Sequence, residues 1–127
     1  MALKARQYAE ERDGAQHEVR LQQMETQLAA AVINADRGEY EPARQTASDF
    51  FTSLRSQLDR GPESDLSNLQ RDKLKGLLAQ RDDVITLLAR SDPAAVTRLS
   101  EIYATYQKAM NAADARVRFA QKVASGA

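Results

Sequence analysis

The chain has 127 residues, 18 of them basic (Lys and Arg) and 18 acidic (Asp and Glu), with a single His and neither Cys nor Trp. This length fits one domain with a hydrophobic core of its own. A net charge of zero disfavours a nucleic-acid partner, because proteins that bind nucleic acids usually carry a basic excess. The absence of Cys excludes a fold built on disulfides, and no stretch reaches the roughly 20 apolar residues of a transmembrane helix.

The composition is typical of a helical protein. Hydrophobic residues make up 43% of the chain, with many Ala and Leu, whereas there are only five Gly and three Pro. Ala and Leu favour helices, and Gly and Pro interrupt them. Because every predicted connection is short, we predict one all-α domain over residues 1–127, an antiparallel up-down-up-down four-helix bundle with long first and last helices.

The first predicted helix covers residues 3–37 and ends at Gly38, the residue type best suited to a left-handed C-terminal cap. The first half of this helix is polar and interrupted by Gly14. The second half carries an apolar stripe at helical spacing. The stripe consists of Leu21, Met24, Leu28, Ala31 and Ala35.

The second predicted helix begins at Pro42, a residue that suits the first helical position, and ends at Asp59. Its apolar face is narrow and aromatic. We expect Phe50 and Leu54 at the centre of this face and Phe51 nearer its edge.

The third and fourth predicted helices follow the breaks at residues 60–62 and 91–93. Ser64 or Ser67 is the candidate N-cap of the third helix, which is the most apolar of the four. Asp92 is the candidate N-cap of the fourth, with Pro93 at its first position. The fourth helix carries a heptad stripe of Val96, Leu99, Tyr103, Tyr106, Met110, Ala113, Val117, Ala120 and Ala124.

The predicted helices differ in length, which implies an overhang. At 1.5 Å per residue the heptad stripe spans about 43 Å, whereas helix 42–59 spans about 27 Å. We therefore expect residues 2–19 and about 112–127 to form a coiled-coil-like stalk, with residues 20–111 as the bundle. A protein partner or a second copy would bind this stalk. The candidate interaction face consists of Ala5, Tyr8, Arg12, Ala15 and Val19.

Arg81 is the one ionisable side chain in the middle of the apolar arc of the third helix. Breaking a buried ion pair typically costs about 3–5 kcal/mol, so a buried guanidinium needs acceptors. We expect Arg81 to clamp the last carbonyls of the first helix, with Asp36 or the Tyr40 hydroxyl as a further partner. The alternative is an anion or ligand site inside the bundle.

The sequence contains no recognisable set of residues for catalysis or for binding a metal or cofactor. His17 has no Glu three residues before it, so the Glu-x-x-His pairs of a di-iron bundle are missing. The neighbours Asp82 and Asp83 diverge around their helix, as solvated surface acids do. With no nucleophile beside a base and no glycine-rich phosphate loop, we predict a protein that is not an enzyme and uses no cofactor or metal.

Three segments carry resemblances to two known families. Residues 38–43 (GEYEPA), with Ala31 before them, resemble the turn and second-helix start of one tetratricopeptide hairpin. Residues 43–51 (ARQTASDFF) and 81–95 (RDDVITLLARSDPAA) resemble a family of small bacterial helical proteins. Full-length members of that family carry an N-terminal membrane anchor ahead of a helical stalk and bundle, and the family implies no particular activity.

Two functions remain open from the sequence. The first is a non-enzymatic module for protein interaction or scaffolding. If the resemblance holds, it is the part that follows the anchor of a bacterial envelope protein, at the periplasmic face of the inner membrane. Without an anchor it would be cytoplasmic. The alternative is a sensory four-helix bundle that binds a small anionic ligand near Arg81. A tightly packed interior around Arg81 would favour the first, and a polar cavity beside it the second.

Overall fold

The protein is described by a computed structural model, which gives the backbone of residues 2–125 and the side chains of residue 12 and residues 14–111. Residues 2–125 form five α-helices and one short 3-10 helix and contain no strand, which confirms the all-α prediction. The elements are α1 (Ala2–Asp36), α2 (Tyr40–Asp59), η1 (Gly61–Glu63), α3 (Asn68–Leu78), α4 (Arg81–Ala89) and α5 (Ala94–Ser125).

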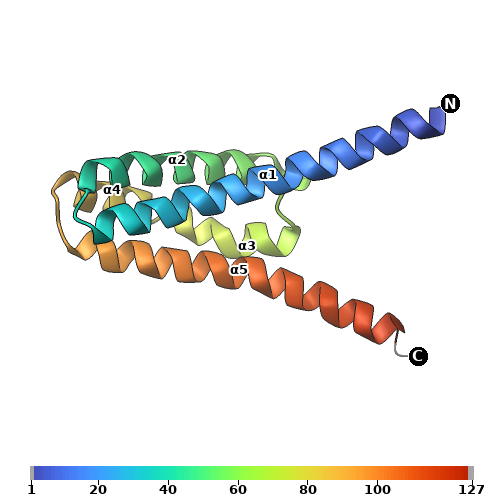
Figure 1. The fold of residues 1–127 in the computed structure, drawn as a ribbon. Coiled ribbons are helices and arrows are strands. Elements are labelled where there is room, and N and C mark those ends of the chain that lie inside the picture. Colours follow the sequence, from blue (N-terminus) through green and yellow to red (C-terminus); the bar gives the residue numbers. More distant parts are fainter. Residues whose placement is uncertain (1, 126–127) are drawn as a thin grey trace.

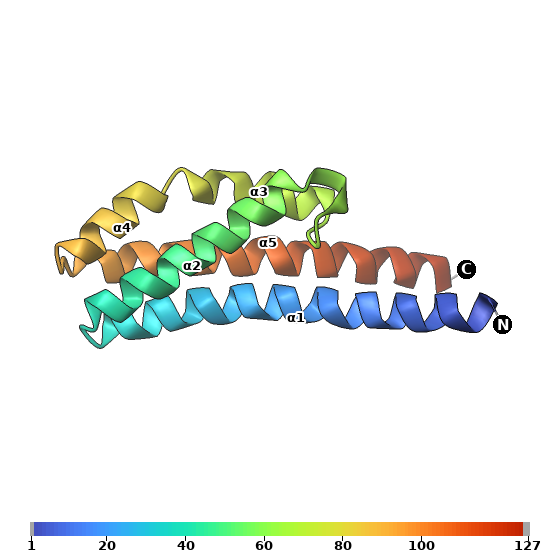
Figure 2. The same ribbon diagram turned by 90° about the horizontal axis from the view of Figure 1, so that it is seen from above.

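The helices run back and forth along one direction (Figures 1 and 2). After α1, the chain returns as α2, turns into α3 and α4 one after the other, and returns again as α5. The α1–α2 and α4–α5 turns lie at one end of the molecule, and the loop between α2 and α3 lies at the other. α1 and α5 both extend beyond this loop on the same side, where their ribbons separate in Figure 1.

The core combines small residues of α1 and α2 with leucines and three aromatic rings. Met24, Leu28 and the two alanines of the predicted α1 stripe are buried, and Leu21 is half-buried. The expected edge position of Phe51 is wrong, because its side chain is 1% exposed, nearly as buried as Phe50. The ring of Phe50 makes edge contacts with Phe51 and Tyr106, at centroid distances of 5.3 and 5.6 Å. Phe51 therefore packs as part of the core.

Local hydrogen bonds set most of the helix ends. Gly38 adopts a φ of +77°, as expected for a left-handed cap. Ser67 caps α3 in a capping box with Gln70, and the Asp92 carboxylate accepts a 2.9 Å hydrogen bond from the amide of Ala94. Only the start of α2 differs, because this helix begins at Tyr40 rather than at Pro42.

The predicted third helix is interrupted between α3 and α4. The amide of Gln80 donates to the carbonyl of Leu77, three residues back, so the regular four-residue spacing is lost there. In an unbroken helix Arg81 would lie between the buried Leu77 and Val84, whereas after the break it is exposed. Exposing a guanidinium avoids a desolvation penalty of several kcal/mol, which outweighs backbone hydrogen bonds worth about 1 kcal/mol each.

The predicted stalk falls mainly on residues whose side chains lie outside the described part of the chain. The backbone is helical from Ala2 in α1 and up to Ser125 in α5. Side chains before residue 12 and after residue 111 are not described. The packing of residues 2–19 against about 112–127 therefore stays a prediction.

Candidate functional site

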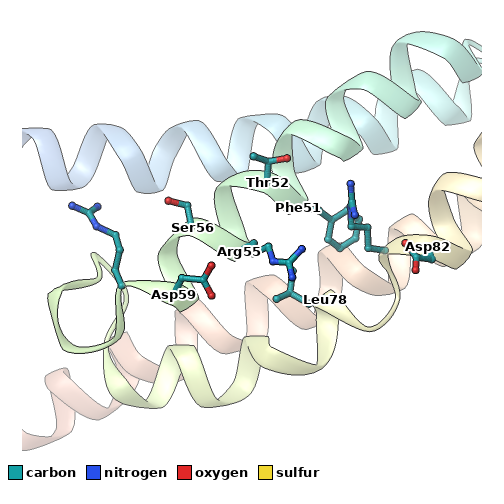
Figure 3. A pocket seen from close by; sticks show the side chains of 9 residues that line it. Phe51, Thr52, Arg55, Ser56, Asp59, Leu78 and Asp82 are labelled. Atoms are coloured by element: carbon teal, nitrogen blue, oxygen red, sulfur yellow. The ribbon is translucent and has the colours of Figure 1, made fainter.

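A groove that is open to solvent lies between α2 and the α3–α4 break (Figure 3). Its volume is about 640 Å³, within the range of about 300–1,000 Å³ that is common for small-molecule sites. The walls come from segments that are far apart in the sequence. Residues 51–60 form one wall, and residues 78–82 form the other.

The α2 wall combines exposed polar side chains with an apolar floor. Thr52, Arg55 and Asp59 share one face of α2 with Ser56, because three or four residues separate neighbours on a helix face. All four side chains are exposed. The half-buried Leu78 of α3 supplies apolar surface between the walls, and Phe51, which also lines the groove, is almost entirely buried.

The opposite wall is formed where α4 begins. Arg81 and Asp82, its first two residues, line the groove and are exposed. The α3–α4 break brings them there, since a continuous helix would direct Arg81 into the core. The groove therefore depends on the interruption between α3 and α4.

The structure contradicts the clamp predicted for Arg81. The last carbonyls of α1 accept hydrogen bonds from the amides of the following turn, for example Asn34 O from the amide of Glu39 at 2.8 Å. No hydrogen bond joins Arg81 to the exposed Asp36 or the half-buried Tyr40 among the described side chains. The prediction assumed a tight connection after the second helix. Residues 60–67 form a longer one. The α1–α2 turn lies at the same end of the molecule as the α4–α5 turn (Figure 1), and Arg81 is about 14 Å along α4 from that end.

Two of the arginines that line the groove have no charged or hydrogen-bonding partner in the described part of the chain. Neither Arg55 nor Arg81 makes an ion pair or a hydrogen bond with the described part of the chain. Arg60 lines the same groove, and its Nη1 lies 3.7 Å from the carboxylate of Asp65. Asp59 and Asp82 add two negative charges, so the lining holds three arginines and two aspartates.

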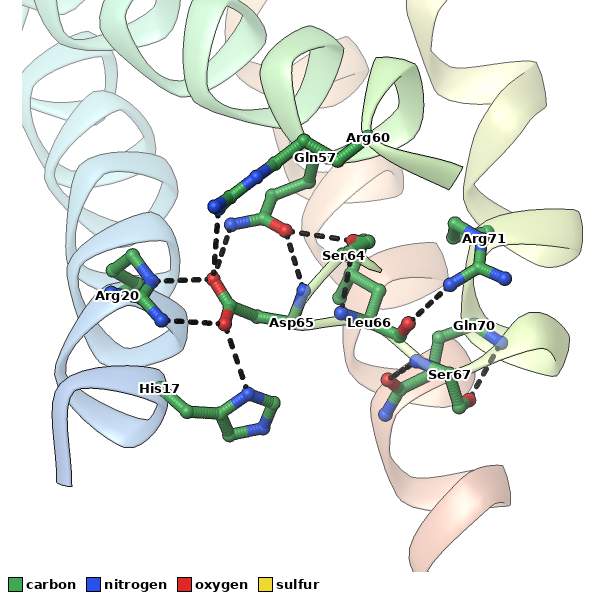
Figure 4. Close-up of polar contacts among 10 residues, drawn as sticks. All are labelled: His17, Arg20, Gln57, Arg60, Ser64, Asp65, Leu66, Ser67, Gln70 and Arg71. Atoms are coloured by element: carbon green, nitrogen blue, oxygen red, sulfur yellow. Dashed lines mark hydrogen bonds and ion pairs between the residues drawn. The ribbon is translucent and has the colours of Figure 1, made fainter. Parts of the chain in front are cut away.

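A buried carboxylate, Asp65, ties the loop after α2 to α1 (Figure 4). Its side chain is 6% exposed. Arg20 donates to both carboxylate oxygens, through Nε at 2.6 Å and Nη2 at 2.8 Å. The Nδ1 of His17 lies 3.0 Å from Oδ1, and the Gln57 amide donates to Oδ2 at 2.7 Å. We call these four residues the Asp65 cluster.

The Asp65 cluster is also bound to the backbone. The Oε1 of Gln57 accepts hydrogen bonds from the amide of Asp65 at 2.8 Å and from the hydroxyl of Ser64 at 2.7 Å. The hydrogen bonds from Arg20 hold the pKa of Asp65 well below its usual range, against the opposing effect of burial, with further lowering by Gln57 and His17. The cluster lies at the end of α2 next to the groove, because Arg60 lines the groove and also lies 3.7 Å from Asp65.

The predicted interaction face is described only in part. Val19 is 52% exposed, and Arg12 and Ala15 are exposed as well. Ala5 and Tyr8 lie outside the described side chains. Whether this face binds a partner stays a prediction.

Sequence reasoning singled out Arg81 but missed its neighbours. Arg55 lies on the polar face of a predicted helix and looks like any solvated arginine, so only its position opposite the α4 start distinguishes it. Asp65 lies in a predicted connection, where an aspartate is common. The capping pattern Ser67-x-x-Gln70 could have placed it just before a helix, but not against His17, which is 48 residues away.

Beyond these features, the described residues contain no group of His, Cys, Asp and Glu side chains arranged to hold a metal ion. None of the helices, as far as they are described, has the length and hydropathy of a membrane span. Comparison of the chain with models of protein families, with curated protein sequences and with solved structures finds no match.

Proposed function

We propose that this chain is a non-enzymatic binding module that recognises an anionic group in the groove between α2 and the α3–α4 break. One observation carries this proposal: two guanidinium groups, Arg55 and Arg81, line one ligand-sized groove without a protein partner in the described part of the chain. A guanidinium is always charged and offers five N–H donors, which suits carboxylates and phosphates.

The remaining lining residues fit such a ligand. The hydroxyl groups of Thr52 and Ser56 can donate to further oxygens of the anion. The half-buried Leu78 offers apolar surface to the part of the ligand that carries the charged group. The polar cavity beside Arg81 is the feature that distinguishes ligand binding from a purely structural role of this residue.

Titration with simple anions tests the proposal. Citrate and sulfate are added to ¹⁵N-labelled protein at constant ionic strength, and the amide shifts of residues 51–60 and 78–82 are followed. We expect saturable shifts in these segments, and at least about tenfold weaker binding in Arg55→Gln and in Arg81→Gln, because each removes charge-assisted hydrogen bonds.

Arg90→Gln is the matched control for this titration. Arg90 is an exposed arginine at the far end of α4, outside the groove. This variant should bind like the unchanged protein. Shifts that do not saturate, or an equal loss in Arg90→Gln, would mean that the anions only sense the general surface charge.

A second candidate function, protein interaction, is favoured by the outer face of α1. Val19 and Ile33 are 52% and 49% exposed, and they lie on the same side of the helix two heptads apart. The two charged residues between them point elsewhere, since Arg20 binds Asp65 and Glu25 accepts from Gln107. A self-association through this face should be lost in Val19→Glu, as measured by sedimentation. A monomeric unchanged protein would rule out self-association through this face.

For the architecture, we infer an up-down-up-down four-helix bundle in which α3 and α4 together form the third helix, with an interruption between them. The alternating chain direction in Figures 1 and 2 supports this assignment. In such a bundle a ligand site between helices is common. The groove would then lie where the interrupted third helix bends away from α2.

A further inference from the structure

We infer that the ligand of the groove is a small phosphate monoester with a compact apolar or aromatic body. This inference rests on the proposed function, since it names the chemical class of the anion that the groove would bind. Two features of the groove carry it: the donors on both walls, and the volume together with the apolar surface. The acidic residues of the lining act against it and provide a test.

The donors of the two walls suit a phosphate better than a carboxylate. A carboxylate presents two oxygens in one plane and a single negative charge. The groove offers a guanidinium from each wall, Arg55 and Arg81, together with the hydroxyls of Thr52 and Ser56. A phosphate monoester presents three terminal oxygens in a tetrahedral arrangement and a charge of about −1.5 to −2 at pH 7. It can therefore be held from both walls at once.

The volume and the floor require more than the phosphate group. At about 640 Å³ the groove is as large as sites that enclose drug-sized molecules, so an inorganic anion would leave most of it to water. Leu78 is half-buried and is the apolar residue of the lining with surface left to cover, since Phe51 is only 1% exposed. An apolar or aromatic body attached to the phosphate would cover Leu78.

The two acidic residues of the lining oppose a dianion. Asp59 and Asp82 are exposed and have no ion-pair partner in the described part of the chain, so they lower the affinity for a phosphate. Solvent screens this repulsion without removing it. Replacing either one by Asn should therefore strengthen the binding of a phosphate monoester. The same replacement should weaken the binding of a ligand that also carries an ammonium group.

The probes that test this inference are phenyl phosphate, inorganic phosphate and benzoate, added separately to the full chain at constant ionic strength. We expect phenyl phosphate to bind at least about tenfold more tightly than benzoate, which has fewer oxygens and a smaller charge, and more tightly than inorganic phosphate, which lacks an apolar body. Asp59→Asn and Asp82→Asn should each raise the affinity for phenyl phosphate about two- to fivefold. Asp49→Asn, which removes an exposed acid of α2 outside the groove, is the control and should leave it unchanged.

The variant Leu78→Ala tests the contribution of the apolar body to binding separately from that of the phosphate group. It should weaken the binding of phenyl phosphate severalfold and leave the binding of inorganic phosphate unaffected, provided that circular dichroism shows an unchanged helix content.

Equal affinities for phenyl phosphate and benzoate, both dependent on Arg55 and Arg81, would overturn the assignment of a phosphate ester but not the proposal that the groove binds anions. Equal affinities for phenyl phosphate and inorganic phosphate would overturn the apolar body. Absence of saturable binding for every anion would overturn the proposed function as well.

Discussion

Tyr106 has the only buried side-chain polar atom without a hydrogen-bond partner among the described residues. Burial, together with the charges of Glu25 and Tyr103, raises the pKa of Tyr106 to about 12, so the hydroxyl keeps its proton as an unused donor. An unsatisfied buried donor costs about 1–3 kcal/mol. Of the two tyrosines in the heptad stripe, only Tyr103 uses its hydroxyl in a hydrogen bond, accepting from Gln107 at 3.0 Å.

We predict that Tyr106→Phe stabilises the protein by about 1 kcal/mol, since the ring contacts with Phe50 remain and the unpaired hydroxyl is removed. Thermal unfolding should show a Tm several degrees higher. Tyr103→Phe is the control, because it removes a hydroxyl that has a partner, and it should not stabilise. A lower Tm for Tyr106→Phe would show that the hydroxyl has an acceptor.

Asp65 makes stability depend on pH in the acid range. A carboxyl whose pKa is lower in the folded than in the unfolded state adds stability above the unfolded value, near 3.9, and loses it as the pH falls toward the folded value. We predict that the free energy of unfolding decreases as the pH falls from about 5 toward 2, and that Asp65→Asn reduces this slope in urea titrations. Asp49→Asn should keep the slope of the unchanged protein.

At neutral pH the same substitution should cost about 2–3 kcal/mol. Breaking a buried ion pair usually costs more, but Arg20 and His17 are 40% and 42% exposed and can turn to solvent. Loss of this contact would release the loop after α2 from α1. A variant as stable as the unchanged protein would show that the Asp65 cluster adds no net stability.

At the scale of the elements, we attribute the α3–α4 break to one side chain, Arg81. If exposing Arg81 is the reason for the break, Arg81→Leu should let α3 and α4 join into one helix that places the new Leu between Leu77 and Val84. We predict greater protection of amides 81–83 from hydrogen exchange and a higher Tm. Arg55→Leu, which changes an exposed arginine on an unbroken helix, is the control. Unchanged exchange at 81–83 would show that the turn at residues 79 and 80 has another cause.

The end of α4 offers a second prediction at this scale. Ser91 adopts a φ of +54°, while its amide and that of Asp92 close the turn onto the carbonyls of Leu88 and Leu87. A left-handed conformation costs a residue with a Cβ about 1–2 kcal/mol more than Gly. Ser91→Gly should therefore raise the free energy of unfolding by about 1 kcal/mol in urea. Ser100→Gly, in the middle of α5, should lower it by a similar amount.

At the scale of the whole molecule, the groove exists only in the folded state, because α2 and α4 meet through tertiary packing. A ligand that binds only the folded chain adds stability of RT ln(1 + [L]/Kd), about 2.7 kcal/mol at a hundredfold excess over Kd. We predict that the Tm rises with the logarithm of the phenyl phosphate concentration, and that Arg81→Gln shows no such rise in the same range. An equal rise in both proteins would place the binding elsewhere.

The sequence by itself determined the features that depend on local interactions. The all-α class follows from composition and from apolar residues at helical spacing. The ends at Gly38 and Asp92 follow because a cap needs only a residue and the backbone a few positions away. For the third helix the sequence left Ser64 and Ser67 as alternatives, and the structure has Ser67. The α1 stripe likewise predicted its buried residues, since a helix face is defined by spacing alone.

Only the tertiary structure decided the groove, the Asp65 cluster and the burial of Phe51. Asp65 meets His17 and Arg20 across 48 and 45 residues, and no local pattern encodes such a pair. Periodicity marked Arg81 as a conflict with a buried helix face but could not choose its solution. A clamp would give the guanidinium protein acceptors, whereas a helix break exposes it to solvent. Which of the two forms depends on the register between α2 and α4. That register is set by the packing of helices that meet only when the chain is folded.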